Sequence, residues 1–248
     1  MVKNRMPFQA RLMQFLVPFS LMFAGFAAPS AAEQQGTPDN VSHGAGPSVQ
    51  GEELTLFNFV GHIKQDGPTL VAYGYLTHIY GLNDADLFTG TFPFVTEADA
   101  RYTFVTNGTF EARFIVGDGN PGNNIFNLVA TVSTTYYFRD QPSSGCVGPP
   151  SPSCLEDPSP FESGTPIATA AGRDSDVNNV QSPNKGVLSG SAELTLLTTP
   201  SKRAGHAPLP LWKPGVKVRI TYVGEATRTD PTGPKSYSLI VGQGTVIR

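Results

Sequence analysis

The segment from Ile125 to Phe138 alternates apolar and polar side chains along most of its length. The apolar positions are Phe126, Leu128, Ala130, Val132, Tyr136 and Phe138, and Asn127, Thr131, Ser133 and Thr135 lie between them. A repeat of two residues places one set on each face of a β-strand. No segment shows a helical period of useful length, and abundant Gly, Pro and Thr favour strands and turns. We therefore expect an all-β fold in which the apolar faces of several strands pack together.

A first hairpin is predicted near the start of this β-rich region. The apolar runs 54–63 and 69–80 flank Lys64-Gln-Asp-Gly-Pro68, and Gly67 suits the left-handed position of a three-residue loop. If Lys64 pairs with Pro68, the aromatic partners across the two strands are Phe57 with Tyr75 and Phe59 with Tyr73. The other face then carries Asn58, His62, Leu70, Gly74 and His78. The pattern leaves open which face lies inside.

A second hairpin is predicted at Asn107-Gly108, between strands at 101–106 and 109–116, because both residues of an Asn-Gly pair accept positive φ. Later strands are expected at 187–198, 216–228 and 237–247. With about eight strands, a single antiparallel β-barrel fits best, and a two-sheet β-sandwich is the alternative. The barrel is favoured because several strands carry apolar or aromatic residues on both faces. An outer-membrane barrel would need a longer and more regular lipid-facing alternation.

The N-terminal segment has the order of a secretory signal peptide. Three basic residues precede an apolar run from Leu12 to Ala28, and small residues end the segment at Ala32. The expected organisation is a signal peptide at 1–32, a flexible leader at 33–51 and a single β domain at 52–248, with long irregular loops at 139–166 and 199–215. The protein is then secreted or periplasmic, with no stable membrane anchor once the signal is removed.

The mature chain is predicted to be acidic. The signal holds three of the 17 basic residues and none of the 20 acidic ones, so its removal leaves a net charge of −6. A nucleic-acid partner is therefore not expected, because such partners require a basic surface. The sequence has no phosphate-binding glycine loop, dinucleotide motif, Gly-x-Ser-x-Gly or His-Glu-x-x-His. No cofactor is expected, and no enzyme class is indicated.

Cys146 and Cys154 are the only cysteines, and they flank a short Pro-rich segment. In an oxidising compartment they are predicted to form a disulfide, since two thiols without a nearby His supply only half of a zinc site. Replacement of Cys146 by Ser is expected to lower the melting temperature while leaving a folded domain. Equal melting temperatures with and without reductant would contradict the bond.

Few side chains are candidates for chemistry. His62 and His78 share one face of the first predicted hairpin, and Asp84 and Asp86 follow that hairpin. These four residues are the candidates for proton transfer, and the alternative is that the histidines are ordinary half-exposed strand residues. Trp212, the only tryptophan, lies in a Pro-rich segment with basic neighbours. It is expected to plug one end of the domain, and docking of an anionic or carbohydrate partner is the alternative.

Oxygen-bearing side chains alternate at Asp174, Asp176 and Asn178, as they do at the start of a calcium-binding loop. Asn179 stands where such a loop needs Gly, and Lys185 stands where it needs Glu. An ordinary turn is therefore the favoured interpretation of this segment, and no metal is expected.

Three functions fit these observations. The favoured one is a binding protein whose barrel holds a small apolar or aromatic ligand, since a barrel of about eight strands can enclose one small ligand. The residues expected to line that site are Phe57, Phe59, Tyr73, Tyr75 and Tyr80. The alternatives are an isomerase or cyclase that uses the cavity, and a structural or adhesive envelope protein without a pocket. A solid lumen would exclude both ligand hypotheses, and titratable groups that converge in a cavity would favour the enzyme.

Overall fold

The computed structural model describes residues 53–90, 95–117, 124–141, 157–198, 209–228 and 235–247. The strands in these ranges are β1 (Leu54–Asp66), β2 (Thr69–Ile79), β3 (Tyr102–Val116), β4 (Ile125–Phe138), β5 (Thr165–Ser182), β6 (Lys185–Leu196), β7 (Lys217–Arg228) and β8 (Lys235–Ile247). Short 3₁₀ helices are η1 (Asp84–Leu87), η2 (Glu97–Asp99) and η4 (Ser159–Glu162). The predicted signal peptide and leader, and both cysteines of the predicted disulfide, lie outside the described residues.

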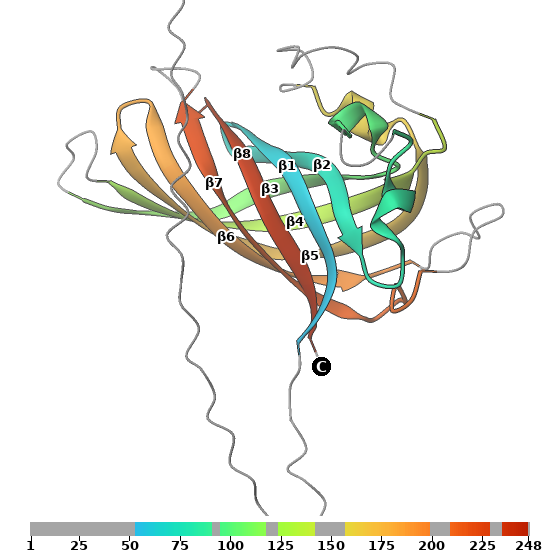
Figure 1. The fold of residues 1–248 in the computed structure, drawn as a ribbon. Helices are drawn as coiled ribbons and strands as arrows, with labels where there is room; N and C mark the ends of the chain where they lie inside the picture. Colours follow the sequence, from blue (N-terminus) through green and yellow to red (C-terminus); the bar gives the residue numbers. More distant parts are fainter. Residues whose placement is uncertain are drawn as a thin grey trace, which may run out of the picture. The chain divides into compact units, whose positions relative to one another are not determined.

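The eight described strands close into one barrel in sequence order, each antiparallel to its neighbours (Figure 1). Closure occurs between β1 and β8, which pair along their whole length. A closed sheet has no exposed edge, and it gives every strand one face toward the lumen. The all-β prediction is therefore confirmed, with the barrel rather than the sandwich.

The connections differ between the two ends of the barrel. At one end, here the hairpin end, tight turns join β1 to β2 and β5 to β6. At the other, the loop end, lie the described parts of the three longer connections, residues 80–90 and 95–101, 139–141 and 157–164, and 197–198 and 209–216. Trp212 lies in the last of these connections, is 1% exposed, and packs edge-on against Tyr136 with ring centroids 4.8 Å apart. It closes the loop end of the lumen, so the predicted plug is confirmed.

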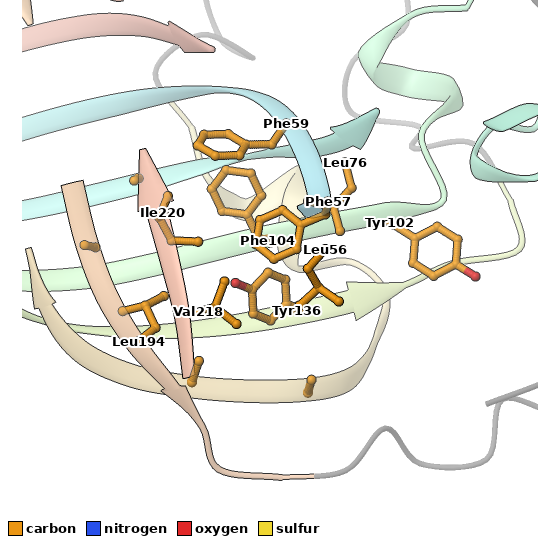
Figure 2. Packing of buried hydrophobic residues seen from close by; sticks show 14 of the residues in the cluster. Leu56, Phe57, Phe59, Leu76, Tyr102, Phe104, Tyr136, Leu194, Val218 and Ile220 are labelled. Carbon is orange, nitrogen blue, oxygen red and sulfur yellow. The ribbon is translucent and has the colours of Figure 1, made fainter. Parts of the chain in front are cut away.

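Alternate residues of each strand fill the lumen with apolar side chains. Phe57 and Phe59 of β1, Phe104 of β3 and Tyr136 of β4 lie together inside the barrel (Figure 2). The rings of Phe59 and Phe104 meet edge to face with centroids 5.4 Å apart, which is a favoured aromatic arrangement. β4 is the segment with the clearest alternation, and its even-numbered positions from 128 onward are buried. The two-residue period of the sequence thus defines the inner face.

The register of the first hairpin differs from the predicted one. Asp66 pairs with Thr69 across the turn, instead of Lys64 with Pro68. The observed partners of Phe57 and Phe59 are Ile79 and Leu76, and those of Tyr73 and Tyr75 are His62 and Val60. The turn changes the register by an odd number of residues, which moves the side chains of one strand to the other face. The two phenylalanines therefore face the lumen and the two tyrosines face outward, so the predicted aromatic ladder is wrong.

The prediction that Asn58, His62 and His78 share one face of the sheet is confirmed. Asn58 pairs directly with His78, because Thr77 is an extra residue that shifts the register of β2 there. Asn58 and His62 are four residues apart on β1, so all three of the predicted polar residues lie on the outer face. Leu70 and Gly74, which were expected beside them, face the lumen.

The predicted turn at Asn107-Gly108 is wrong, because both residues lie within β3. Gly108 faces the lumen where two side chains approach it, and a Cβ there would lie 2.8 Å from Leu70 Cγ and 3.0 Å from Val132 Cγ1. The glycine therefore allows close packing rather than a turn. The change of direction between β3 and β4 falls after Val116.

The later strands β6, β7 and β8 are confirmed to within about two residues of their predicted bounds. β5 is the strand that the sequence did not indicate. Its inner positions are mostly small or polar, namely Ala168, Ala170, Gly172, Asp174 and Asp176. Such a strand lacks the apolar alternation from which the others were recognised, and the predicted loop at 139–166 overlaps its first residues.

Replacement of Gly108 by Val is expected to lower the free energy of unfolding by about 1–3 kcal/mol, because the side chain must displace Leu70 and Val132 in a packed lumen. Asn107→Ala, at the exposed neighbouring position on the outer face, is the control and is expected to change stability by less than about 0.5 kcal/mol. Urea unfolding measures both values. Equal stability of the Gly108 variant and the wild type would contradict the close packing.

Candidate functional site

β5 carries the most polar part of the lumen wall. Asp174 and Asp176 point into a mostly apolar barrel, with exposed fractions of 7% and 4%. The strand is paired on both sides here, since Asp176 lies opposite Leu128 of β4 and Gly190 of β6. The two carboxylates are therefore held on one face, about 7 Å apart along the strand at their Cα atoms.

Tyr222 of β7 reaches past β6 to both carboxylates. Its hydroxyl donates to Asp174 Oδ2 at 2.9 Å and is also in hydrogen-bond contact with Asp176 Oδ1. The path is open because Gly190 lies between them, where a Cβ would overlap the phenol and the Asp176 carboxyl group. The hydroxyl has one proton for two acceptor oxygens, so the group is one donor short when both carboxyl groups are ionised.

Burial controls the ionisation of this group. It raises the pKa of Asp174 to about 6. Burial first, and then the charge of Asp174, raise the pKa of Asp176 to about 8. Burial and the two carboxylates raise the pKa of Tyr222 well above its ordinary value, so the phenol stays protonated. Between about pH 6 and pH 8 the two carboxyl groups therefore hold one proton and carry one negative charge.

A cavity of about 60 Å³ lies beside this group in the lumen. It is lined by Phe59, Ile63, Leu70, Ala72, Phe104, Thr106, Val132, Thr134, Asp174, Ala192, Leu194, Ile220, Tyr222 and Ile240. Such a volume holds roughly four water molecules or a ligand of similar size. Oδ1 of Asp174 is buried and has no hydrogen-bond partner among the described residues. The cavity thus combines apolar walls with one unpaired, strong acceptor.

A second polar cluster lies on the outer face of the barrel. His62 is 1% exposed; its Nε2 lies 2.8 Å from Glu97 Oε1, and its Nδ1 is in hydrogen-bond contact with the hydroxyl of Tyr237. Tyr73 and Phe161 pack against the imidazole, with ring centroids 5.4 Å and 6.3 Å from it. Glu97 belongs to η2 and Phe161 to η4, so the loop-end connections cover this face of β1 and β2. His62 is therefore enclosed outside the lumen.

The other predicted candidates for proton transfer also lie outside the lumen. His78 Nδ1 is 2.8 Å from Asp84 Oδ1 in an exposed pair at the loop end. Asp86 is exposed in η1. His62 and His78 each bind a different carboxylate, and none of the four predicted residues lines the described cavity.

The five aromatic residues predicted to line a ligand site are divided by the observed register. Phe59 lines the cavity, and Phe57 lies inside the barrel nearer the loop end. Tyr73 and Tyr75 face outward, and Tyr80 is 41% exposed just beyond β2. Of the five predicted residues, Phe59 is therefore the one that lines the cavity.

Asp174, Asp176 and Asn178, interpreted from sequence as a turn with some likeness to a calcium loop, lie on a β-strand, so the turn interpretation is wrong. Within the described ranges, no group of three or more His, Cys, Asp or Glu side chains could hold a metal ion. The described part of the chain also has no helix long and apolar enough to cross a membrane. The spacing of two residues between Asp174 and Asp176 indicates that both lie on one face of a strand. Their partner Tyr222 is distant in sequence, so no local pattern predicts the contact.

No family model, curated protein or solved structure matched the chain. The chemistry of the lumen is therefore the basis on which a function can be argued.

Proposed function

We propose that the barrel is a binding protein that holds one small, mostly apolar ligand in its lumen. The observation that carries the proposal is the unpaired Oδ1 of Asp174 in the wall of the apolar cavity. A buried acceptor without a donor costs about 1–3 kcal/mol, and a ligand that donates a hydrogen bond there recovers this free energy. The apolar walls add the free energy of removing the rest of the ligand from water. If the predicted signal peptide operates, the ligand is met outside the cytoplasm.

Ethanol and dimethyl ether form a matched pair of probes, because they are isomers of similar small volume and only ethanol donates a hydrogen bond. We expect both to shift the methyl NMR signals of Ile220 and Ile240, with ethanol bound about tenfold more tightly. Ala192→Leu, which fills the cavity, is expected to abolish both effects. Ala171→Leu, on the outer face of β5, is the control and should leave them unchanged. Absence of any lumen shift in the wild type would overturn the proposal.

The same group also supports a second candidate, an isomerase-type enzyme. Asp174 and Tyr222 both line the cavity, which gives it a carboxylate base beside a hydroxyl donor. With a small β,γ-unsaturated aldehyde, Asp174 would take the proton from the α-carbon and return it to the γ-carbon, while Tyr222 donates to the enolate oxygen. The double bond moves into conjugation, and no other reactant is consumed.

But-3-enal, the smallest β,γ-unsaturated aldehyde, tests this candidate because its conjugated product absorbs in the ultraviolet. If the protein is such an enzyme, Asp174→Asn lowers the rate of isomerisation at least about a hundredfold. A wild-type rate equal to that of the variant would contradict catalysis and leave the binding proposal in place.

A further inference from the structure

We infer that the ligand selected by the lumen is a small organic cation, a primary ammonium ion on an apolar body. The inference rests on the proposed binding function and names its ligand class. It is carried by the buried carboxyl group of Asp174, whose Oδ1 is unpaired in a cavity wall that has no basic side chain among its described residues, and by the second buried carboxyl group, Asp176, on the same face of β5.

The first step concerns charge. Asp174 and Asp176 are almost fully buried, and the side-chain partner that the structure shows for both is the neutral phenol of Tyr222. Between about pH 6 and pH 8 this group carries a negative charge. A charge taken out of water without an opposite charge costs several kcal/mol. A bound cation would supply the missing opposite charge.

The second step concerns hydrogen bonding. Oδ1 of Asp174 lines the cavity and is buried without a partner in the described part of the chain. A carboxylate oxygen only accepts hydrogen bonds, so a matching ligand has to donate. An ammonium group brings three donors and a positive charge, an alcohol brings one donor and no charge, and a carboxylate brings neither.

The third step concerns the apolar walls. Phe59 and Phe104 line the same cavity, together with Ile220 and Leu194. Aliphatic and aromatic walls of this kind bind the body of the ligand, and ring faces also attract a cation placed near them. A strongly hydrated inorganic ion finds no such complement of ligands here. The walls therefore favour an organic amine over a metal ion.

Ethylamine, ethanol and acetate separate charge from size, since the three probes have similar small volumes that suit a cavity of about 60 Å³. Isothermal titration of the full chain at pH 7.5 is expected to show ethylamine bound at least tenfold more tightly than ethanol, with acetate weakest. Binding of the amine should release protons, measured as a dependence of the heat on the buffer, because the cation displaces the proton shared by the carboxyl pair. Affinity for the amine should fall as the pH is lowered below about 6, where Asp174 becomes neutral.

Asp174→Asn combined with Asp176→Asn is expected to remove the preference, leaving the amine and the alcohol within about threefold of each other. Asp86→Asn, at an exposed carboxylate of η1 outside the cavity, should retain the preference and checks that its loss is not a general effect of removing a carboxylate. Ethanol bound as tightly as ethylamine by the wild type would overturn the cation inference while leaving the proposed function intact. Failure of ethylamine, ethanol, acetate and dimethyl ether to bind would overturn both.

Discussion

Replacement of Asp176 by Asn is expected to raise the free energy of unfolding at pH 8 by on the order of 4 kcal/mol and to change it little at pH 4. The wild type keeps a carboxyl group in the lumen that is 4% exposed and has a pKa raised to about 8 by burial and by the charge of Asp174. Asparagine cannot ionise, and its amide oxygen can still accept the hydrogen bond from the Tyr222 hydroxyl. The variant therefore avoids the cost of ionising a buried carboxyl group and keeps the hydrogen bond to Tyr222.

The direction of this effect follows from proton binding. The unfolded chain releases the Asp176 proton near the ordinary aspartate pKa of about 3.9, whereas the folded barrel keeps it up to about pH 8. The unfolded state thus binds fewer protons in this window, and the contribution of Asp176 to stability decreases as the pH rises from about 4 to about 8. Urea unfolding at pH 4, 6 and 8 measures the difference between variant and wild type. Asp86→Asn, at an exposed carboxylate, controls for the loss of one charge. A difference that is constant across the three pH values would contradict the assigned burial.

The second large effect is expected at Arg139. This side chain is 8% exposed and donates from Nε to the carbonyl of Ala100 at 2.6 Å. It also donates to the carbonyls of Pro160 and Glu97, each at 3.0 Å. One guanidinium group therefore ties the segments that carry η2 and η4 to the end of β4, and these segments cover His62.

Arg139→Met is expected to lower the free energy of unfolding by about 3 kcal/mol, since several buried carbonyl groups lose their donor at once. Arg173→Met is the matched control: that arginine is 68% exposed and pairs with Glu111, so its loss should cost less than about 1 kcal/mol. Hydrogen exchange at Tyr73 and Phe161 should also accelerate in the Arg139 variant, because the cover detaches from β2 before the barrel opens. An Arg139 variant as stable as the Arg173 variant would show that the cover is held by its apolar contacts alone.

The candidate site illustrates which features a sequence pattern can miss. The Asp-Ser-Asp segment was interpreted as a turn because Asp and Ser are common in turns, yet it continues a strand whose inner neighbours are Ala and Gly. What makes the segment a site is Tyr222, together with Gly190, whose missing side chain leaves room for the phenol. These residues meet only because β5, β6 and β7 are adjacent and in one register. No local pattern contains that information.

The sequence by itself determined the class of fold and most of the strands, because a two-residue alternation such as that of Ile125–Phe138 is a local property of the chain. Tertiary structure alone decided the register. Pairing of Asp66 with Thr69 turned Tyr73 and Tyr75 outward, and the packing around Gly108 made a strand from an expected turn. It also decided that two aspartates face a cavity. Register and cavities depend on which distant side chains fit against one another, and barrel closure imposes that choice on all the strands together.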